Sequence, residues 1–381
     1  MARDDPAESA RPGSEAELAR MVADAQRRGL KVSPRGGATK SDWGGPVDRV
    51  DLAVSTLSLN RVLEHAAGDM TVTVEAGCTI AALQQTLARQ GQRLASDPIW
   101  PDRATVGGVL AANDSGSLRH AFGPLRDLVL GVTVALPDGT LARSGGKVVK
   151  NVAGYDLPKL MTGAFGTLGI VTRATFRVHP LPRESRTFEF TAFNPVDAGR
   201  FMRVINDSPV TVTGLQVVAR RVAPCAVALR VEGSPAGVEA SSTLVVEVAA
   251  ACGFAPSPEW SNPWCQSQRL WDLPGSLAKV TFPPSQFSDL CALVPGALWT
   301  LVAQGVGVGW VATDAGPDDL AGLAERLQAL GGSLLVFRGD PQLKRRVNMR
   351  TLAGVLPLMR RVKEQFDPLG TLNPGTFGGG I

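Results

Sequence analysis

A glycine-rich loop, Pro34-Arg35-Gly36-Gly37-Ala38-Thr39-Lys40-Ser41, is the most informative segment in the first part of this chain. It follows a short predicted strand over Leu30 to Pro34, and a predicted helix precedes that strand. The helix begins at Ser14, which has capping-box spacing with Glu17. Consecutive glycine amides with no Cβ in the way can converge on phosphate oxygens, whereas the alternative interpretation is an ordinary turn. The loop alone fits both interpretations.

Two well-known phosphate-binding motifs are excluded. Lys40-Ser41 matches the end of a Walker loop, but Thr39 precedes the lysine and Pro34 occupies the position of the first required glycine. The glycines of Gly163–Gly169 have the spacing G-x-x-G-x-x-G, and they precede a predicted strand instead of opening a helix. A Rossmann dinucleotide fold is therefore not indicated.

Two further glycine-rich loops follow at wide spacing. One is Thr105-Val106-Gly107-Gly108-Val109-Leu110-Ala111-Ala112-Asn113-Asp114-Ser115-Gly116, and the other is Gly163-Ala164-Phe165-Gly166-Thr167-Leu168-Gly169-Ile170. A tight turn explains any single glycine. Three such loops in one chain indicate that backbone repeatedly approaches a ligand closely.

The ordered set of loops resembles the FAD-binding domain of the vanillyl-alcohol oxidase, or p-cresol methylhydroxylase, family. Members carry Pro-x-Gly-Gly-x-Thr, then Thr-x-Gly-Gly with a small-Ser-Gly turn, then Gly-Thr-Leu-Gly-Ile, and finally Asn-Pro-Gly. All four occur here in this order between residues 34 and 375, with Asp114 where a small residue is usual. The chain is most similar to the FAD-binding subunits of bacterial glycolate dehydrogenases. That likeness rests on Val148–Leu157, His120–Asp127, Leu334–Asp340 and Phe366–Pro368.

The resemblance implies which residues hold the cofactor. The first loop would wrap the FAD pyrophosphate with backbone amides, the second would pass the ribityl chain and flavin ring, and Pro98 would lie near the ring system. Gly169 and Ile170 would present backbone to the adenine, and Asn373 would return toward the flavin. The implied FAD-binding residues are Arg35, Gly36, Gly37, Ala38, Thr39, Lys40, Pro98, Thr105, Gly107, Gly108, Asn113, Ser115, Gly116, Gly123, Gly166, Gly169, Ile170 and Asn373.

The resemblance and the element pattern together predict an α+β flavoprotein: a two-subdomain FAD-binding domain with an inserted ferredoxin-like cap domain. We expect a loose tail at residues 1–13, the FAD domain at 14–182, the cap at 183–340, and a C-terminal segment at 341–381 that completes the FAD domain. Strand-like and helix-like stretches alternate within 186–340, as two β-α-β units on an antiparallel sheet require. The helices predicted there are Asp197–Asn206, Val238–Ala251 and Asp318–Leu330.

Composition excludes several classes of protein. Among 381 residues, 39 are Lys or Arg and 35 are Asp or Glu, and the net charge of +4 gives no sign of a nucleic-acid partner. The five cysteines form no Cys-x-x-Cys pair, so the chain shows no iron–sulfur spacing and its thiols are expected to be reduced. There is no secretory h-region and no run of about 18 apolar residues. We expect a cytoplasmic protein, peripheral at the inner membrane only through its partners.

The placement of histidine bears on the cofactor and on metals. The three histidines are His65, His120 and His179, and none lies in the first loop. Non-covalent FAD is therefore favoured, with covalent attachment through His120 as the alternative. Residues 186–340 contain no histidine, so we expect no divalent-metal site of the type that related D-2-hydroxy-acid dehydrogenases carry in their caps.

Oxidation of a 2-hydroxy acid needs a cation for the carboxylate and a base for the hydroxyl proton. Arg119, His120 and Lys150 are the candidates, since all three are close in sequence to the flavin loops. Each also has a structural explanation: an ion pair for Arg119, a hydrogen bond within the loop for His120, and a surface charge for Lys150. The sequence leaves the catalytic residue unassigned.

The resemblance implies a subunit of a glycolate dehydrogenase complex, which oxidises glycolate to glyoxylate. Its expected partners are a homologous FAD subunit, which would hold the catalytic base, and an iron–sulfur subunit, which would accept the electrons. The first alternative is a stand-alone FAD-dependent D-2-hydroxy-acid or alcohol dehydrogenase, and the histidine-free cap counts against it. The second alternative is an assembly subunit that has lost FAD, and the intact glycine loops count against it.

Overall fold

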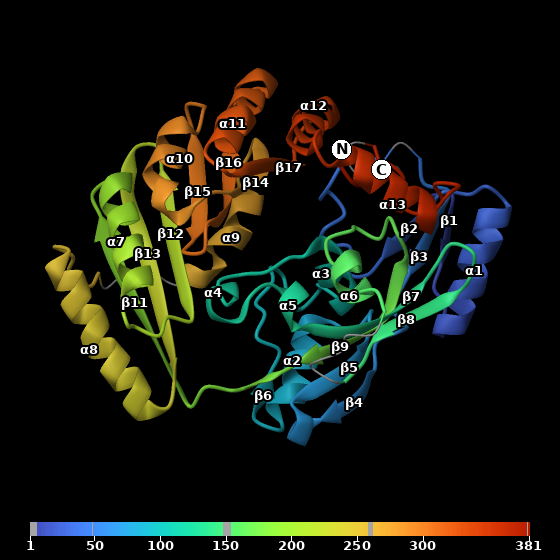
Figure 1. The fold of residues 1–381 in the computed structure, drawn as a ribbon, viewed down its shortest axis with the longest axis horizontal. Helices are drawn as coiled ribbons and strands as arrows, with labels where there is room; N and C mark the ends of the chain where they lie inside the picture. The colour runs from blue at the N-terminus through green and yellow to red at the C-terminus, as the bar shows by residue number, and fades with distance from the viewer. Residues whose placement is uncertain (1–5, 48, 148–153, 258–261, 379) are drawn as a thin grey trace. The chain divides into compact units, whose positions relative to one another are not determined.

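The computed structural model describes residues 6–47, 49–147, 154–257, 262–378 and 380–381. Contacts divide the chain into two compact units, each of which can be followed in Figure 1. Unit 1 comprises residues 1–115, 123–181 and 352–381, and unit 2 comprises residues 116–122 and 182–351. The chain therefore leaves unit 1 twice and returns to it twice.

The two units differ from the predicted domains at two places. Helix α12 (Pro341–Leu352) belongs almost entirely to unit 2 instead of completing the FAD domain, because Leu343 and Val347 are buried in the unit 2 core. Residues 116–122 also belong to unit 2, where Ser117 Oγ accepts a hydrogen bond from Arg230 Nη2 at 3.0 Å. The predicted boundary at residue 340 therefore lies one helix too early.

Unit 1 contains a parallel sheet with the strand order β1-β3-β2. The prediction of a loose tail is wrong for residues 8–10, because Glu8 to Ala10 pair with Leu52 to Val54. Helix α1 (Glu15–Arg27) packs on this sheet and begins as the capping-box spacing predicts, since Ser14 Oγ accepts a hydrogen bond from the Glu17 amide at 3.2 Å. The strands are β1 (Glu8–Ala10), β2 (Val32–Arg35) and β3 (Leu52–Ser55).

A second sheet of unit 1 is antiparallel, with the order β4-β5-β9-β7-β8. Strand β9 pairs with both β5 and β7, so the strand that follows the third glycine loop occupies the middle of the sheet. The strands are β4 (Val62–Ala66), β5 (Thr71–Glu75), β7 (Val129–Ala135), β8 (Leu141–Gly145) and β9 (Ile170–Arg177). Helix α2 (Ile80–Ala88), a 3₁₀ turn η1 (Ala67–Asp69) and the short pair β6 (Gln92–Arg93) and β10 (His179–Pro180) flank it.

Short helices carry the segments between these strands. The sequence shows little periodicity over residues 104–123, yet α3 forms there because both of its ends are capped. Thr105 Oγ1 accepts a hydrogen bond from the Gly108 amide at 3.4 Å, and Asn113 ends the helix with φ 47°. The helices are α3 (Val106–Ala112), α4 (Arg119–Phe122, in unit 2), α5 (Leu125–Leu128), α6 (Leu157–Met161) and α13 (Leu356–Phe366).

Unit 2 is built on a seven-stranded sheet with the order β11-β13-β12-β15-β16-β14-β17, in which neighbouring strands are antiparallel. Its second half runs β14-α10-β15-β16-α11-β17, which is the β-α-β-β-α-β order of a ferredoxin-like fold. The first half, β11-α7-β12-β13-α8, repeats that order without a last strand, and the β12–β15 pairing joins the halves. The expected ferredoxin-like cap is confirmed. The strands are β11 (Glu184–Ala192), β12 (Gly214–Arg220), β13 (Ala223–Gly233), β14 (Ser276–Thr281), β15 (Trp299–Gln304), β16 (Val308–Thr313) and β17 (Ser333–Arg338).

The helices of unit 2 share one apolar core with one face of this sheet (Figure 1). Leu215 and Val217 of β12 belong to that core, so Gln216 between them points to the opposite face. Strand β14 and helix α10 were not predicted, whereas the other three helices lie within three residues of the predicted ranges. The helices are α7 (Pro195–Asp207), α8 (Pro235–Ala251), α10 (Phe287–Leu293) and α11 (Pro317–Ala329), with the short α9 (Gln266–Arg269) and the 3₁₀ turns Pro263–Cys265, Leu270–Asp272 and Pro284–Gln286.

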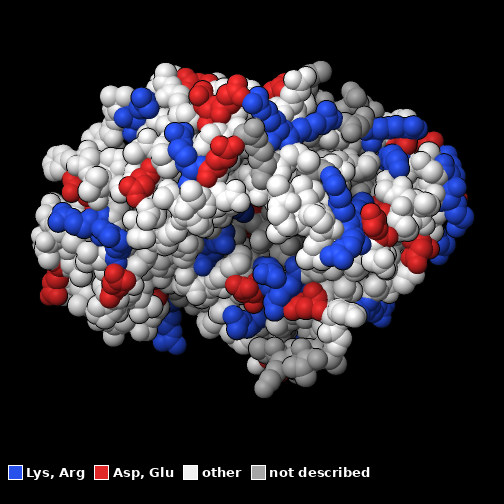
Figure 2. All heavy atoms as spheres, turned by 45° about the horizontal axis from the view of Figure 1, so that its top comes forward, with Lys and Arg blue, Asp and Glu red and all other residues white. Residues whose placement is uncertain are grey.

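The charges are mixed over the face that Figure 2 shows, where Lys and Arg lie among Asp and Glu. This is what a net charge of +4 predicts for a chain of this length. No helix in the described ranges is long and apolar enough to cross a membrane. The described residues also contain no group of three or more His, Cys, Asp or Glu that would hold a metal ion.

Candidate cofactor-binding site

Two adjacent cavities lie within unit 1, with volumes of about 90 Å³ and about 70 Å³. The first extends along the first glycine loop as far as Ser41 and reaches Asn373 and Thr376, and the second extends to Gly169 and Ile170. Segments from four distant parts of the chain therefore meet at one place. The cavities share the lining residues Pro34, Arg35, Gly36, Gly108, Ala111 and Phe165.

The first loop presents uncovered backbone amides to the larger cavity. Residues 36–41 all line it, and Ala38 adopts φ 53°, a left-handed conformation that turns the chain. The amides of Gly36 to Ser41 donate no hydrogen bond to another residue in the part of the chain that the structure describes. Successive amides in such a turn form an anion-binding concavity.

The two glycines of the first loop are required by its contact with the second loop. A Cβ on Gly36 would lie 2.0 Å from Thr105 Oγ1, and a Cβ on Gly37 would lie 1.7 Å from the Arg103 carbonyl oxygen. The second loop is fixed in turn, since the Gly107 amide donates to the Ala76 carbonyl at 2.8 Å. Glycine at both positions therefore allows the first loop to lie directly against residues 103–105.

A buried ion pair links the first loop to the end of the second. Lys40 Nζ lies 3.1 Å from Asp114 Oδ2, and the two side chains are only 7% and 3% exposed. The ammonium also lies 3.3 Å from Thr39 Oγ1 and 5.4 Å from the centre of the Trp43 ring. The same Asp114 oxygen accepts a hydrogen bond from the Ile99 amide at 3.2 Å.

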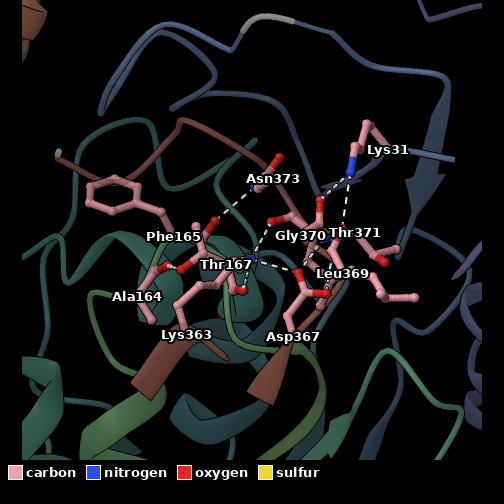
Figure 3. Close-up of polar contacts among 11 residues, drawn as sticks. Lys31, Ala164, Phe165, Thr167, Lys363, Asp367, Leu369, Gly370, Thr371 and Asn373 are labelled. Atoms are coloured by element: carbon pink, nitrogen blue, oxygen red, sulfur yellow. Dashed lines mark hydrogen bonds and ion pairs between the residues drawn. The ribbon is translucent and has the colours of Figure 1, made fainter. Parts of the chain in front are cut away.

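The C-terminal segment contributes Asn373 and Thr376 to the lining of the site, and Figure 3 shows Asn373 in contact with Phe165. Asn373 Nδ2 donates to the Phe165 carbonyl in the third loop at 2.7 Å, and the Asn373 amide donates to the Val32 carbonyl at 2.8 Å. A Cβ on Gly166, which has φ 68°, would lie 2.9 Å from Pro34 Cγ. The first loop, the third loop and the C-terminal segment are thus in direct contact.

The residues present fit a dinucleotide cofactor. Three buried polar atoms of cavity-lining side chains, Arg35 Nε, Asn373 Oδ1 and Thr376 Oγ1, have no hydrogen-bond partner among the described residues. Orphaned polar atoms of this kind call for an explanation, and a missing ligand is one. Together with the uncovered amides and the positive charge of Arg35, they favour a phosphorylated ligand. With volumes of about 90 Å³ and about 70 Å³, the two cavities would take only part of a dinucleotide.

Most of the predicted cofactor-binding residues line these cavities. Five do not: Asn113 caps α3, Gly116 belongs to unit 2, and Pro98, Ser115 and Gly123 lie outside both linings. The predicted residues that line at least one cavity are Arg35, Gly36, Gly37, Ala38, Thr39, Lys40, Thr105, Gly107, Gly108, Gly166, Gly169, Ile170 and Asn373.

Sequence reasoning missed several lining residues. Phe165 lies inside the third loop, and Thr376 directly follows Asn373-Pro374-Gly375, so the motifs themselves contained the signal. Trp43 and Met161 line the site through side chains that no motif marks. Their position depends on the packing of whole loops, which sequence spacing does not specify.

Of the candidate catalytic residues, Arg119 and His120 are not among the lining residues of the two cavities. Arg119 and His120 form α4 of unit 2, and Lys150 lies outside the described residues. Burial lowers the pKa of His120 below its ordinary value of 6.5, and its Nδ1 has no hydrogen-bond partner among the described residues. His120 is therefore neutral near pH 7.

The chain resembles known flavoproteins in sequence. Residues 6–145 match the family model described as an FAD binding domain. The chain is 28% identical over 353 residues to glycolate oxidase subunit GlcE of Escherichia coli, which covers 90% of this chain and 91% of that protein. It is 26% identical over 412 residues to D-2-hydroxyglutarate dehydrogenase of Xanthomonas citri pv. viticola, covering 96% of this chain and 87% of that protein.

Other relatives match over a smaller part. Glycolate oxidase subunit GlcD of Bacillus subtilis is 31% identical over 187 residues, which is 49% of this chain and 40% of GlcD. Among solved structures, alkyldihydroxyacetonephosphate synthase superimposes with a TM-score of 0.71 at 19% identity, covering 96% of this chain and 76% of that one. This last likeness shows the fold alone.

The amide-lined cavities, the matched domain and the relatives agree with one another. The expected cofactor and the expected class of reaction are thereby confirmed. This chain is an FAD-dependent oxidoreductase whose residues 6–145 match an FAD binding domain, and its relatives include subunits of glycolate oxidase.

Proposed function

We propose that this chain is the FAD-carrying subunit of an enzyme complex that oxidises a small 2-hydroxy acid, with glycolate as the first substrate to test and glyoxylate as its product. The observation that carries the proposal is the likeness to GlcE, which continues through both units of the chain. The likeness to a D-2-hydroxyglutarate dehydrogenase over nearly the same length points to the same class of substrate.

The residues of unit 1 would hold the cofactor without a covalent bond. The amides of residues 36–41 and the guanidinium of Arg35 would bind the diphosphate, and Asn373 and Thr376 line the same cavity. Non-covalent binding belongs to this proposal because the first glycine loop contains no histidine to which the flavin could be attached. When bound, FAD supplies an acceptor for the two electrons that leave the carbon bearing the hydroxyl group. Pro98, Asn113, Ser115, Gly116 and Gly123 stay predicted contacts of the rest of the cofactor.

The electrons would leave through partner subunits. GlcE and GlcD are named as subunits of glycolate oxidase, so we propose a homologous FAD subunit as one partner. An iron–sulfur subunit is the proposed electron acceptor, because the sequence contains no Cys-x-x-Cys with which this chain would bind a cluster itself. A cytoplasmic location, with membrane contact only through these partners, belongs to the same proposal.

A stand-alone dehydrogenase is the second candidate, and one arrangement in unit 2 favours it. Ser117 Oγ accepts a hydrogen bond from Arg230 Nη2 at 3.0 Å, and the Ser117 carbonyl accepts one from the His120 amide at 3.0 Å. A guanidinium and a neutral imidazole are therefore carried on neighbouring segments of one unit. In this candidate Arg230 would bind the substrate carboxylate and His120 would take the hydroxyl proton.

Anaerobic reduction of the bound flavin distinguishes the candidates. The chain is purified alone and again with its partner subunits, and glycolate or D-lactate is added while the flavin absorbance is recorded. If the chain works as a subunit of a complex, the flavin should be bleached only in the presence of the partner subunits. Bleaching of the isolated chain, abolished by His120→Gln with FAD affinity unchanged, would instead establish the stand-alone enzyme. A flavin that no 2-hydroxy acid reduces in either preparation would refute both.

A further inference from the structure

We propose that Lys40 and Asp114 are a positioning pair: a charge-compensated strut that holds the first glycine loop against the second, while backbone amides and Arg35 bind the cofactor diphosphate. The proposal rests on the FAD site proposed above and adds a role that the glycine motifs do not contain. It assigns the Lys40 ammonium to the protein wall and not to the phosphate.

The geometry leaves the ammonium of Lys40 fully engaged by the protein. Its Nζ lies 3.1 Å from the Asp114 carboxylate, 3.3 Å from Thr39 Oγ1 and 5.4 Å from the centre of the Trp43 ring. The carboxylate and the hydroxyl accept two of its three N–H groups, and the Trp43 ring adds a cation–π contact. With 7% of the side chain exposed, little of the charge remains available to a ligand in the cavity.

Asp114 joins three segments at one carboxylate. Its Oδ2 receives Lys40 from the first loop and the Ile99 amide from the segment after Pro98. Its own amide donates to the Val109 carbonyl at 3.1 Å, at the end of α3. Loss of the carboxylate would therefore lower the melting temperature of the cofactor-free protein, because one group fastens the first loop, the 98–100 segment and the helix.

Charge compensation explains why a carboxylate is tolerated beside a diphosphate site. A buried carboxylate with no cation would repel the phosphates and would also be costly to desolvate. Lys40 cancels that charge, so the pair contributes no net charge to the cavity that Lys40 lines. The attraction for an anion then comes from the amides of residues 36–41 and from Arg35, which lines both cavities.

A double-mutant cycle tests the proposal. The variants are Lys40→Met, Asp114→Asn and Lys40→Met with Asp114→Asn, and the measurements are the FAD dissociation constant, from quenching of flavin fluorescence, and the melting temperature of the cofactor-free protein. We expect Lys40→Met to weaken FAD binding at least tenfold, because the carboxylate is left uncompensated. We expect the double variant to bind FAD within about threefold of the wild type, since neither charge remains.

The opposite role for Lys40 predicts a different pattern. If its ammonium bound the phosphate, the double variant would lose as much affinity as Lys40→Met, and Asp114→Asn would not lower the melting temperature. Either result overturns the strut. Should Lys40→Met fail to fold, Asp114→Asn and the double variant still decide, because the strut requires a lower melting temperature for the first and nearly normal FAD affinity for the second.

An exposed pair in the same unit provides the matched control. Lys159 Nζ lies 2.9 Å from Asp156 Oδ2 with both side chains about half exposed, and Lys159→Met is expected to change neither readout. Wild-type protein that binds no FAD would refute the cofactor site itself. Normal binding by the wild type, with equal losses in Lys40→Met and the double variant, would refute only the strut.

Discussion

Lys363 and Asp367 form a buried ion pair one helical turn apart, with Lys363 Nζ 2.6 Å from Asp367 Oδ2 (Figure 3). The same ammonium donates to the Thr167 carbonyl at 2.7 Å and to the Leu372 carbonyl at 3.0 Å. Asp367 in turn accepts hydrogen bonds from the amides of Thr371 and Leu372. One side chain of α13 therefore fastens the third glycine loop to the segment that carries Asn373 and Thr376.

Replacement of Lys363 by methionine should destabilise unit 1 strongly. The variant would leave Asp367, whose side chain is fully buried, without its cation, and loss of one partner of a buried pair costs about 3–5 kcal/mol. Burial lowers the pKa of Lys363, and the nearby Asp367 carboxylate opposes that shift. Urea unfolding measures the loss. Lys363→Met combined with Asp367→Asn should recover part of it, and an undiminished free energy of unfolding in Lys363→Met would contradict this account.

Arg35→Met should weaken FAD binding without a large change in stability. The guanidinium lies where both cavities meet, and a charge-assisted hydrogen bond is worth about 1.5–3 kcal/mol, or roughly 10- to 150-fold in affinity. The loss should shrink as salt is raised, because salt screens the attraction between the guanidinium and the phosphates. Fluorescence titration with FAD at several salt concentrations checks both points. Arg89→Met, at an exposed position that ends α2, is the control and should bind normally.

Gly37→Ala should disrupt the arrangement of the backbone amides of residues 36–41 that would bind the diphosphate. The added Cβ would meet the Arg103 carbonyl at 1.7 Å, so the first loop would have to move away from the second. We expect FAD affinity to fall by a factor of 100 or more, on the order of 3 kcal/mol. Gly68→Ala is the matched control, because a Cβ there would meet no atom within 4 Å. Equal affinity in the two variants would show that the first loop does not hold the cofactor.

His120 should make the protein less stable as the pH falls below about 6.5. Burial lowers the pKa of His120 in the folded state, so the unfolded chain takes up that proton first and the free energy of unfolding rises with pH through this window. His120→Gln should therefore gain stability relative to the wild type between pH 7 and pH 5.5. His179→Gln is the comparison, since burial and nearby arginines lower the pKa of His179 too. Burial raises the pKa of Glu189, so this group also makes the stability of the wild type depend on pH. The quantity to follow is therefore the difference in free energy of unfolding between His120→Gln and the wild type at each pH. If this difference did not change between pH 7 and pH 5.5, His120 would be in contact with water and this account would be wrong.

The cofactor site could be predicted further than the catalytic groups could. Gly36 and Gly37 could be predicted because a glycine-rich loop signals a close approach, and a Cβ would meet the Thr105 side chain at one and the Arg103 carbonyl at the other. Ser14 marks a helix start by local chemistry alone. The pairing of Lys40 with Asp114 is different, since 74 positions separate the two residues and no local rule brings them together. Sequence reasoning noticed Asp114 only as an unusual residue within a motif.

The errors in the predicted boundaries have a common physical origin. The segment 341–381 was assigned to the FAD domain as a whole, whereas the burial of Leu343 and Val347 in the unit 2 core places most of α12 in unit 2. Strand β14 was also missed, and its place in the sheet is determined by its pairing with β16 and β17. Arg119 and His120 follow the second loop in sequence, yet the contacts of residues 116–122 are with unit 2. Each case depends on a long-range contact, which local patterns do not encode.

The return of the chain to unit 1 sets an order of events during synthesis. Asn373 and Thr376 follow the whole of unit 2 in the sequence, although they complete a wall whose other residues lie before residue 172. The ribosome must therefore synthesise about 170 residues of unit 2 before Asn373 and Thr376 can complete the lining of the cavities. At roughly 5–20 residues per second, this takes on the order of ten seconds or more. The FAD site is therefore complete only after unit 2 has been synthesised. A chain that ends before residue 373 should bind FAD weakly and lack the yellow colour of a flavoprotein.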